Sequence, residues 1–212
     1  AMSMAKSLGA DGAEVAMSRQ QGLSVSTRLG EVENVEFTND GGLGITVYKG
    51  GRKGSASTAD LSEKALKQAI EAAVNIAKYT SVDECSGMAD KELLAMNPPD
   101  LDLYHPQELT TEQAISLAKE CEDTALAYDK RITNSDGATL ASFEGFKVYG
   151  NSHGQIVGYP STRHSLSCVM IANEGDDMQR DYAYTVSREF NAMESAAKIG
   201  QQASIEALSR LG

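Results

Sequence analysis

The histidines are the residues of this sequence best suited to metal binding or proton transfer, because an unperturbed imidazole titrates between about pH 5 and 8. There are three, His105, His153 and His164. No two of them have the spacing of an HExxH motif, which places two imidazoles on one helical face to hold zinc. His153 lies in an Asn-Ser-His-Gly turn, where we expect it to make hydrogen bonds.

His164 belongs to a segment rich in hydroxyl groups, residues 161–167, and directly follows Arg163. Successive side chains of a strand point to opposite faces, so Arg163 and His164 cannot line the same pocket. A nucleophile at Ser165 or Ser167 would need an orienting acid beside His164, and the sequence has no GxSxG elbow. The segment therefore does not predict self-contained catalysis. We expect His153, Arg163 and His164 to contact a peptide or a partner protein instead.

Glycines mark a second candidate for contact with another chain. Gly41, Gly42 and Gly44 precede the run Ile-Thr-Val-Tyr at residues 45–48. Glycine at such a place indicates hairpin or bulge geometry, or a strand edge kept open for an incoming peptide strand. Both explanations stay open, and Gly42 and Gly44 join the predicted contact residues. The run is not a phosphate loop, because neither Lys-Ser/Thr nor a helix follows it.

The first part of the chain predicts an antiparallel meander. In residues 22–58, three runs with the two-residue period of half-buried strands are joined at Leu29-Gly30, at 39–42 and at 49–51. A separate strand is expected at 13–18. A helix is expected at 61–79, begun by a capping-box pattern at Asp60 and Glu63.

Residues 83–106, which include Pro98-Pro99, predict a linker. A helix opened by Thr110 and Gln113 follows, and a last helix is expected from about Ala192, capped by Asn191 and Glu194. The predicted class is α+β, with antiparallel strand meanders covered by helices in two successive α+β units. We expect an N-terminal domain at 1–82, the linker, and a central domain at 107–212. Alternating runs in the central domain cover residues 139–150, 155–159, 163–173 and 178–188.

A short internal echo links the two parts. Gly44-x-x-Val47-Tyr48 matches Gly145-x-x-Val148-Tyr149. Hairpins draw on few residue types, so the match reflects either similar turns or a duplication.

Composition excludes several classes of protein. The formal net charge is −11, which disfavours binding to nucleic acid. No apolar run is long enough to cross a membrane. The three cysteines lack a CxxC spacing, which is typical of a reducing cytosol. The chain starts inside what looks like a helix tail at 4–8, so we expect the native start to lie upstream.

Longer motifs resemble the TldD/PmbA family along nearly the whole chain. The first part carries Asp-Gly-Ala-Glu-Val at 11–15 and Gly-Glu-Val-Glu-Asn-Val-Glu-Phe at 30–37. The later motifs resemble the PmbA/TldE-type subunits of the family rather than the TldD-type. They lie at 90–95, 99–103, 130–134, 150–154, 161–167 and 180–185.

The resemblance implies a cytoplasmic, non-catalytic subunit of a TldD–PmbA zinc metallopeptidase pair, which acts in microcin maturation and antitoxin degradation. In the family, an HExxxH motif on the TldD-type subunit holds the metal. This sequence has no HExxxH and stops before the family's C-terminal domain. We therefore expect no catalytic residue, metal ligand or cofactor here, and zinc on the partner. Expected partners are a TldD-type subunit, a peptide or unfolded substrate and, as a further option, a second copy. The alternative is a regulatory module that modulates DNA gyrase or its inhibitors without proteolysis.

Overall fold

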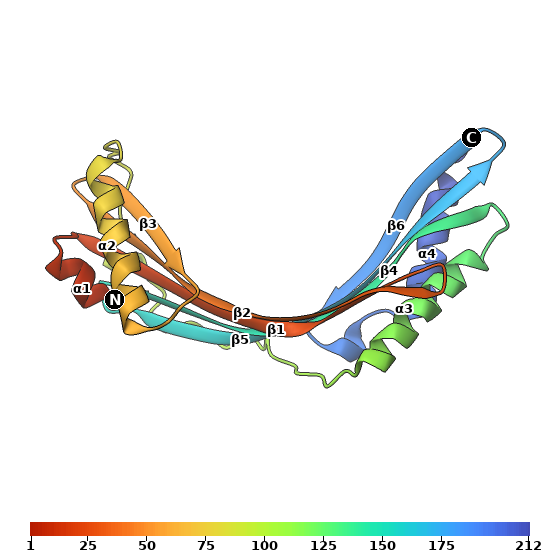
Figure 1. Cartoon of the computed structure of the whole chain (residues 1–212), viewed down its shortest axis with the longest axis horizontal. Coiled ribbons are helices and arrows are strands. Elements are labelled where there is room, and N and C mark those ends of the chain that lie inside the picture. Colours follow the sequence, from red (N-terminus) through yellow and green to blue (C-terminus); the bar gives the residue numbers. More distant parts are fainter. The chain divides into compact units, whose positions relative to one another are not determined.

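The structure is a computed structural model that describes residues 1–212. Its strands come in two groups of three, each flanked by helices, and two of the strands span nineteen residues each. In chain order they are α1 (Met2–Ser7), β1 (Gly12–Arg28), β2 (Glu31–Lys49), β3 (Arg52–Thr58), α2 (Glu63–Tyr79), α3 (Thr111–Leu126), β4 (Ile132–Asn151), β5 (Ile156–Glu174), β6 (Asp177–Ser187) and α4 (Ala196–Ser209), with 3-10 turns at Lys91–Leu93 and Phe190–Ala192 (Figure 1).

The strands form one six-stranded sheet in the order β3-β2-β1-β4-β5-β6. β2 and β3 pair antiparallel from Leu43↔Thr58 to Lys49↔Arg52, and β5 and β6 from His164↔Ser187 to Glu174↔Asp177. The α+β class predicted from the sequence is confirmed. None of the helices is long and apolar enough to cross a lipid bilayer.

The chain divides into two compact units, each built from three separate segments. Unit 1 takes residues 1–20, 39–101 and 145–160, and unit 2 takes 21–38, 102–144 and 161–212. Because β1, β2, β4 and β5 each contribute to both units, neither unit is a continuous stretch of the sequence. The ranges 1–82, 83–106 and 107–212 therefore stay a prediction about domains along the chain.

In unit 1 the core lies between one face of the sheet and α2. Leu43, Ile45 and Val47 of β2 are buried and pack with the apolar face of α2, as their two-residue period requires. Gly54 of β3 lets the helix approach the sheet closely. A Cβ there would lie 2.0 Å from the carbonyl oxygen of Ala73 in α2.

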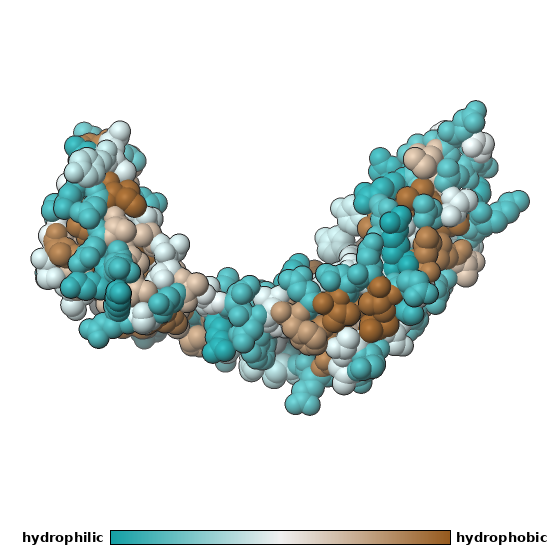
Figure 2. All heavy atoms as spheres, viewed as in Figure 1, coloured by the Kyte–Doolittle hydropathy of each residue, from teal (hydrophilic) through white to brown (hydrophobic).

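In unit 2, α3 and α4 pack against each other and cover one face of the sheet. Leu140, Leu166 and Met170 are buried beneath them. Gly200 of α4 lies against the backbone of α3, where a Cβ would sit 2.1 Å from the carbonyl oxygen of Cys121. In Figure 2, each unit shows a mainly hydrophilic surface with smaller apolar patches.

Several predicted breaks are wrong, because glycine and polar residues continue inside long strands. Residues 39–42 do not form a turn but belong to β2, and the predicted strand at 13–18 is the first part of β1. Gly22 continues β1 because β4 lies against it, and a Cβ there would come within 2.3 Å of the Ser142 carbonyl oxygen.

The predicted hairpin joints at Leu29-Gly30 and Gly50-Gly51 are confirmed, with positive φ at all four residues. The capping box of Thr110 and Gln113 is also confirmed. Two caps were placed wrongly. Ser62 caps α2 in place of Asp60, and Ser195 caps α4 in place of Asn191, because each serine oxygen accepts a backbone N–H three residues on.

Candidate functional site

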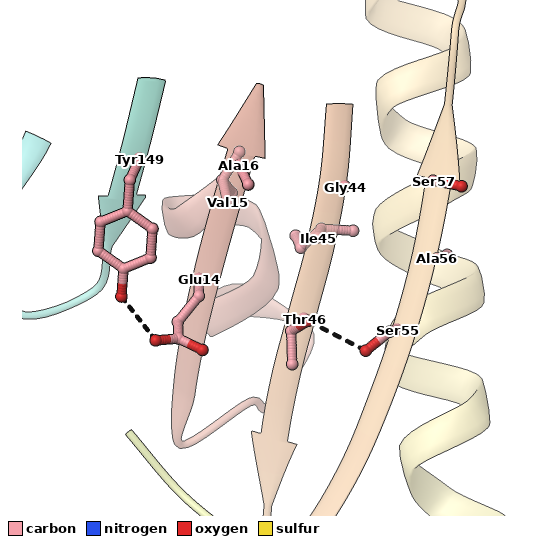
Figure 3. Close-up of a pocket in the computed structure, with 10 residues that line it drawn as sticks. All are labelled: Glu14, Val15, Ala16, Gly44, Ile45, Thr46, Ser55, Ala56, Ser57 and Tyr149. Carbon is pink, nitrogen blue, oxygen red and sulfur yellow. Dashed lines mark hydrogen bonds between the residues drawn. The ribbon is translucent and has the colours of Figure 1, made fainter. Parts of the chain in front are cut away.

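A shallow groove crosses the face of the unit 1 sheet opposite α2. Its volume is about 420 Å³. Neighbouring parts of β1, β2 and β3 form its floor, and one tyrosine of β4 stands at its end (Figure 3). The lining residues are Glu14, Val15, Ala16, Gly44, Ile45, Thr46, Ser55, Ala56, Ser57 and Tyr149.

The groove exists because small residues meet in its middle. Gly44 of β2 pairs with Ser57 of β3, and Ala16 of β1 lies on the other side. A Cβ at Gly44 would find only the Ala16 carbonyl oxygen, at 4.0 Å. The floor is therefore backbone and small side chains, open to a ligand that lies along the sheet.

Glu14 is the charged group of this site. Both of its oxygens accept hydrogen bonds from phenols, from Tyr48 Oη at 2.8 Å and from Tyr149 Oη at 2.6 Å. Figure 3 shows Tyr149 and Glu14 pointing toward each other from β4 and β1. Hydrogen bonds to a carboxylate are shorter and stronger than neutral ones, so the two tyrosines fix the position of the charge.

The same contacts keep the phenols protonated. Burial and then the hydrogen bond to Glu14 raise the pKa of Tyr48 to about 12. Burial and the same carboxylate also raise the pKa of Tyr149. A phenol in this state donates a hydrogen bond and does not act as a base near neutral pH. The site is built for recognition through hydrogen bonds, to which the Thr46–Ser55 hydroxyl pair, 3.0 Å apart, adds a polar rim.

Of the predicted contact residues, Gly44 lines the groove. Gly42 lies two residues earlier in β2, where a Cβ would stand 3.2 Å from the Thr58 carbonyl oxygen. An open strand edge at residues 43–49 is excluded, because β3 pairs with β2 from Leu43 to Lys49. His153 is exposed in the β4–β5 turn, and its backbone N–H donates to Asn151 Oδ1.

Arg163 and His164 lie in unit 2 and face opposite sides of the sheet, since Arg163 is exposed and His164 is buried. The serine beside His164 is Ser142, whose Oγ is 2.9 Å from Nδ1, and neither Ser165 nor Ser167 takes that place. The other imidazole nitrogen faces the His105 carbonyl oxygen at 3.4 Å. Burial lowers the pKa of His164. The Ser142–His164 pair has the His105 backbone carbonyl where a catalytic triad has an acid, so we assign this hydrogen bond a structural role in the core of unit 2.

Sequence reasoning missed Glu14 and its two tyrosines. A signal was present, because Tyr48 and Tyr149 are the final residues of the two echoed Gly-x-x-Val-Tyr segments. Both bring a phenol to the same carboxylate. No group of three or more His, Cys, Asp or Glu side chains is placed to hold a metal ion.

Two family descriptions match this chain. The PmbA/TldA metallopeptidase central domain matches residues 104–211, and PmbA/TldA metallopeptidase domain 1 matches residues 13–77. The chain belongs to the PmbA/TldA metallopeptidase family. Nine of the ten residues that line the groove fall within the domain 1 match, and the tenth, Tyr149, falls within the central-domain match.

Relatives of known name agree with this assignment. Metalloprotease PmbA of Escherichia coli O157:H7 is 56% identical over 95% of this chain and 45% of that protein. A PmbA homologue of Haemophilus influenzae is 53% identical over 100% of this chain and 47% of its own length. The chain therefore spans about half the length of the curated relatives it matches.

Solved structures share the fold. A Bacteroides thetaiotaomicron protein proposed to be a modulator of DNA gyrase aligns with a TM-score of 0.88 and 29% identity, over 100% of this chain and 48% of its own. TldE of Thermococcus kodakarensis aligns with a TM-score of 0.70 over 98% of this chain and 46% of its own. At 18% identity, the second likeness shows the fold alone.

Proposed function

We propose that the chain is the front part of a non-catalytic, PmbA/TldE-type subunit in a zinc metallopeptidase pair. Its work is to bind a TldD-type subunit and to hold an extended peptide substrate. Family membership supports the setting in proteolysis. The observation that carries the binding role is the groove in unit 1, whose polar groups are held as hydrogen-bonding partners and whose floor leaves room for a chain lying along the sheet.

The residues present do not fit the zinc ion that the family implies. His164 is buried and has both ring nitrogens facing protein atoms, Ser142 Oγ and the His105 carbonyl oxygen. The Nε2 atom of His105 faces the carbonyl oxygen of Asp102 at 2.9 Å, and His153 belongs to the other unit. We therefore derive no step through a metal in this chain, and we place the zinc on the TldD-type partner.

The site suggests how a peptide would be held. An extended peptide lying in the groove would meet the hydroxyls of Thr46, Ser55 and Ser57 along its backbone, and Glu14 at one end. Hydrogen bonds to the backbone do not depend on the peptide's sequence, as a shared proteolytic subunit requires. The substrates that we propose are antibiotic precursors and antitoxins, in the cytoplasm.

The second candidate function is modulation of DNA gyrase or its inhibitors without proteolysis. It is favoured by one observation, the structural likeness to the Bacteroides protein proposed to be a gyrase modulator. Co-purification separates the two functions, because the first requires a stable complex with a TldD-type subunit and the second does not.

The test of the groove uses peptide hydrolysis by the mixture of this chain and a TldD-type subunit. Gly44→Leu fills the middle of the groove. Gly87→Leu is the matched control, since a Cβ at this exposed glycine of unit 1 meets nothing within 4 Å. We expect Gly44→Leu to raise KM with little change in kcat, and Gly87→Leu to leave both unchanged. Equal kinetics for the two variants would remove the groove from the proposal.

A further inference from the structure

The first part of β2 in unit 2, residues 31–38, is a strand with a free edge and two uncovered faces. β1 precedes it in the hairpin, and β3 pairs with β2 only from Leu43 onward. Residues 31–37 are all exposed, including Val32 at 41%, Val35 at 37% and Phe37 at 71%. A strand of this kind presents unpaired N–H and C=O groups, which template pairing with another chain.

Residues 31–38 are extended in β2 although their side chains bury almost no surface. Fixing the backbone of each residue costs about 1–2 kcal/mol of conformational entropy, and apolar burial does not offset that cost here. The strand is held by its pairing with β1, and two further contacts hold the tip of their hairpin. The buried carboxylate of Glu122 on α3 accepts the N–H groups of Leu29 at 2.8 Å and Gly30 at 3.3 Å. Arg28 Nε donates to the Ser135 carbonyl oxygen at 3.0 Å.

The charge of the free strand has one sign. Residues 31–38 read Glu-Val-Glu-Asn-Val-Glu-Phe-Thr, with three carboxylates and no cation. The side-chain carboxylates of Glu31, Glu33 and Glu36 form neither an ion pair nor a hydrogen bond in the structure. Glu31 and Glu33 share one face of the strand with Val35 and Phe37, and Glu36 shares the other face with Val32, and these apolar side chains are equally uncovered. The strand that complements it therefore carries basic residues interspersed with apolar ones.

We propose that residues 31–38 are a docking edge for an extended segment of a different polypeptide, one that carries lysine or arginine interspersed with apolar residues. The segment pairs its backbone with the free edge, sets its cations against the glutamates and covers Val32, Val35 and Phe37. A second copy of this chain does not meet the requirement, because it would add three more carboxylates and no cation to the same strip. The docking edge does not depend on the peptidase pair proposed above.

The probe is a fluorescent peptide of four Lys-Val repeats, whose binding is followed by anisotropy at low ionic strength. A peptide of four Lys-Pro repeats carries the same charge but lacks half of the N–H donors and cannot form a strand ladder. The first protein variant is Glu31→Lys/Glu33→Lys, because these two side chains lie on the same face of the strand and can both oppose lysines of the peptide. Its control is Glu84→Lys/Glu92→Lys, which makes the same change of net charge at exposed residues of unit 1.

We expect the Lys-Val peptide to bind and the Lys-Pro peptide not to bind. Replacing attraction by repulsion at two cross-strand positions should weaken binding about tenfold in the first variant, and much less in the control. Hydrogen exchange should slow at residues 31–38 and not in β3, the edge strand of unit 1. The proposal would be overturned if the Lys-Val peptide did not bind, or if both peptides bound equally. It would also be overturned if both variants lost the same affinity, or if hydrogen exchange slowed only in other segments. Binding of the wild-type chain to itself that the Lys-Val peptide does not displace would also overturn it.

Discussion

Glu122 offers the sharpest test of how the free strand is held in place. It is fully buried, and its two oxygens accept from consecutive N–H groups at the β1–β2 turn. Leu29 in this turn has a φ of +50°, a left-handed conformation that costs a residue other than glycine roughly 1–2 kcal/mol. The carboxylate therefore stabilises a turn that the leucine side chain disfavours.

Glu122→Gln keeps the shape of the side chain but removes the charge and turns one oxygen into an amide donor. A hydrogen bond to a charged group contributes about 1.5–3 kcal/mol, and a neutral one about 0.5–1.5 kcal/mol. The variant loses one of the two hydrogen bonds and weakens the other. Part of this loss is offset, because an uncharged amide costs less to bury than a carboxylate. We therefore expect the free energy that holds the turn closed to fall by about 2 kcal/mol. That corresponds to roughly a 30-fold increase in opening of the turn.

Hydrogen exchange at Leu29 and Gly30 measures this opening directly, and urea unfolding followed in unit 2 measures its effect on stability. Glu120→Gln is the control, because Glu120 is exposed on the same helix and makes no hydrogen bond to the turn. Faster exchange at the turn in Glu122→Gln alone is the expected result. Unchanged exchange and an unchanged urea midpoint would refute the assignment of Glu122 as the group that holds the hairpin.

The remaining predictions concern packing and titration. Gly54→Ala should destabilise unit 1 by about 3 kcal/mol or more because of overpacking against Ala73, whereas Gly44→Ala should change the free energy of unfolding by less than about 1 kcal/mol, as urea unfolding would show. Tyr48, with a pKa raised from 10.0 to about 12, should ionise at a higher pH than free tyrosine in an ultraviolet titration. Its contribution to stability is present below pH 10 and lost as the pH rises toward 12. Since burial lowers the pKa of His164 from 6.5, its contribution to the free energy of unfolding should be present above pH 6.5 and fall on acidification. In a His164→Gln variant, the free energy of unfolding should lose that part of its dependence on acid pH.

Much of the fold follows from local signals in the sequence. The two-residue period of Leu43, Ile45 and Val47 and the paired left-handed turns at 29–30 and 50–51 depend on neighbouring residues, so the sequence predicts them. The long strands do not follow in this way. Gly22 and Gly41 look like breaks, and only the strand lying against each of them shows why glycine is needed within β1 and β2.

The candidate site depends on contacts between distant residues. Glu14 and Tyr149 are far apart in the sequence and meet because β4 brings its tyrosine to the carboxylate of β1. The sequence contained the echo that pairs Tyr48 with Tyr149, but it gave no reason to connect them with Glu14. Glu122 is similar, since a glutamate among the apolar residues of a helix predicts nothing until the turn beside it is known.

The central claim is that this chain contributes binding surface and no bond-breaking group to its assembly. The most direct measurement is hydrolysis of an unfolded peptide by the chain alone, with added zinc and with a chelator, beside the mixture with a TldD-type subunit. We predict no cleavage by the chain alone under any of these conditions, and chelator-sensitive cleavage by the mixture. Zinc-dependent, chelator-sensitive cleavage by the chain alone would contradict the account.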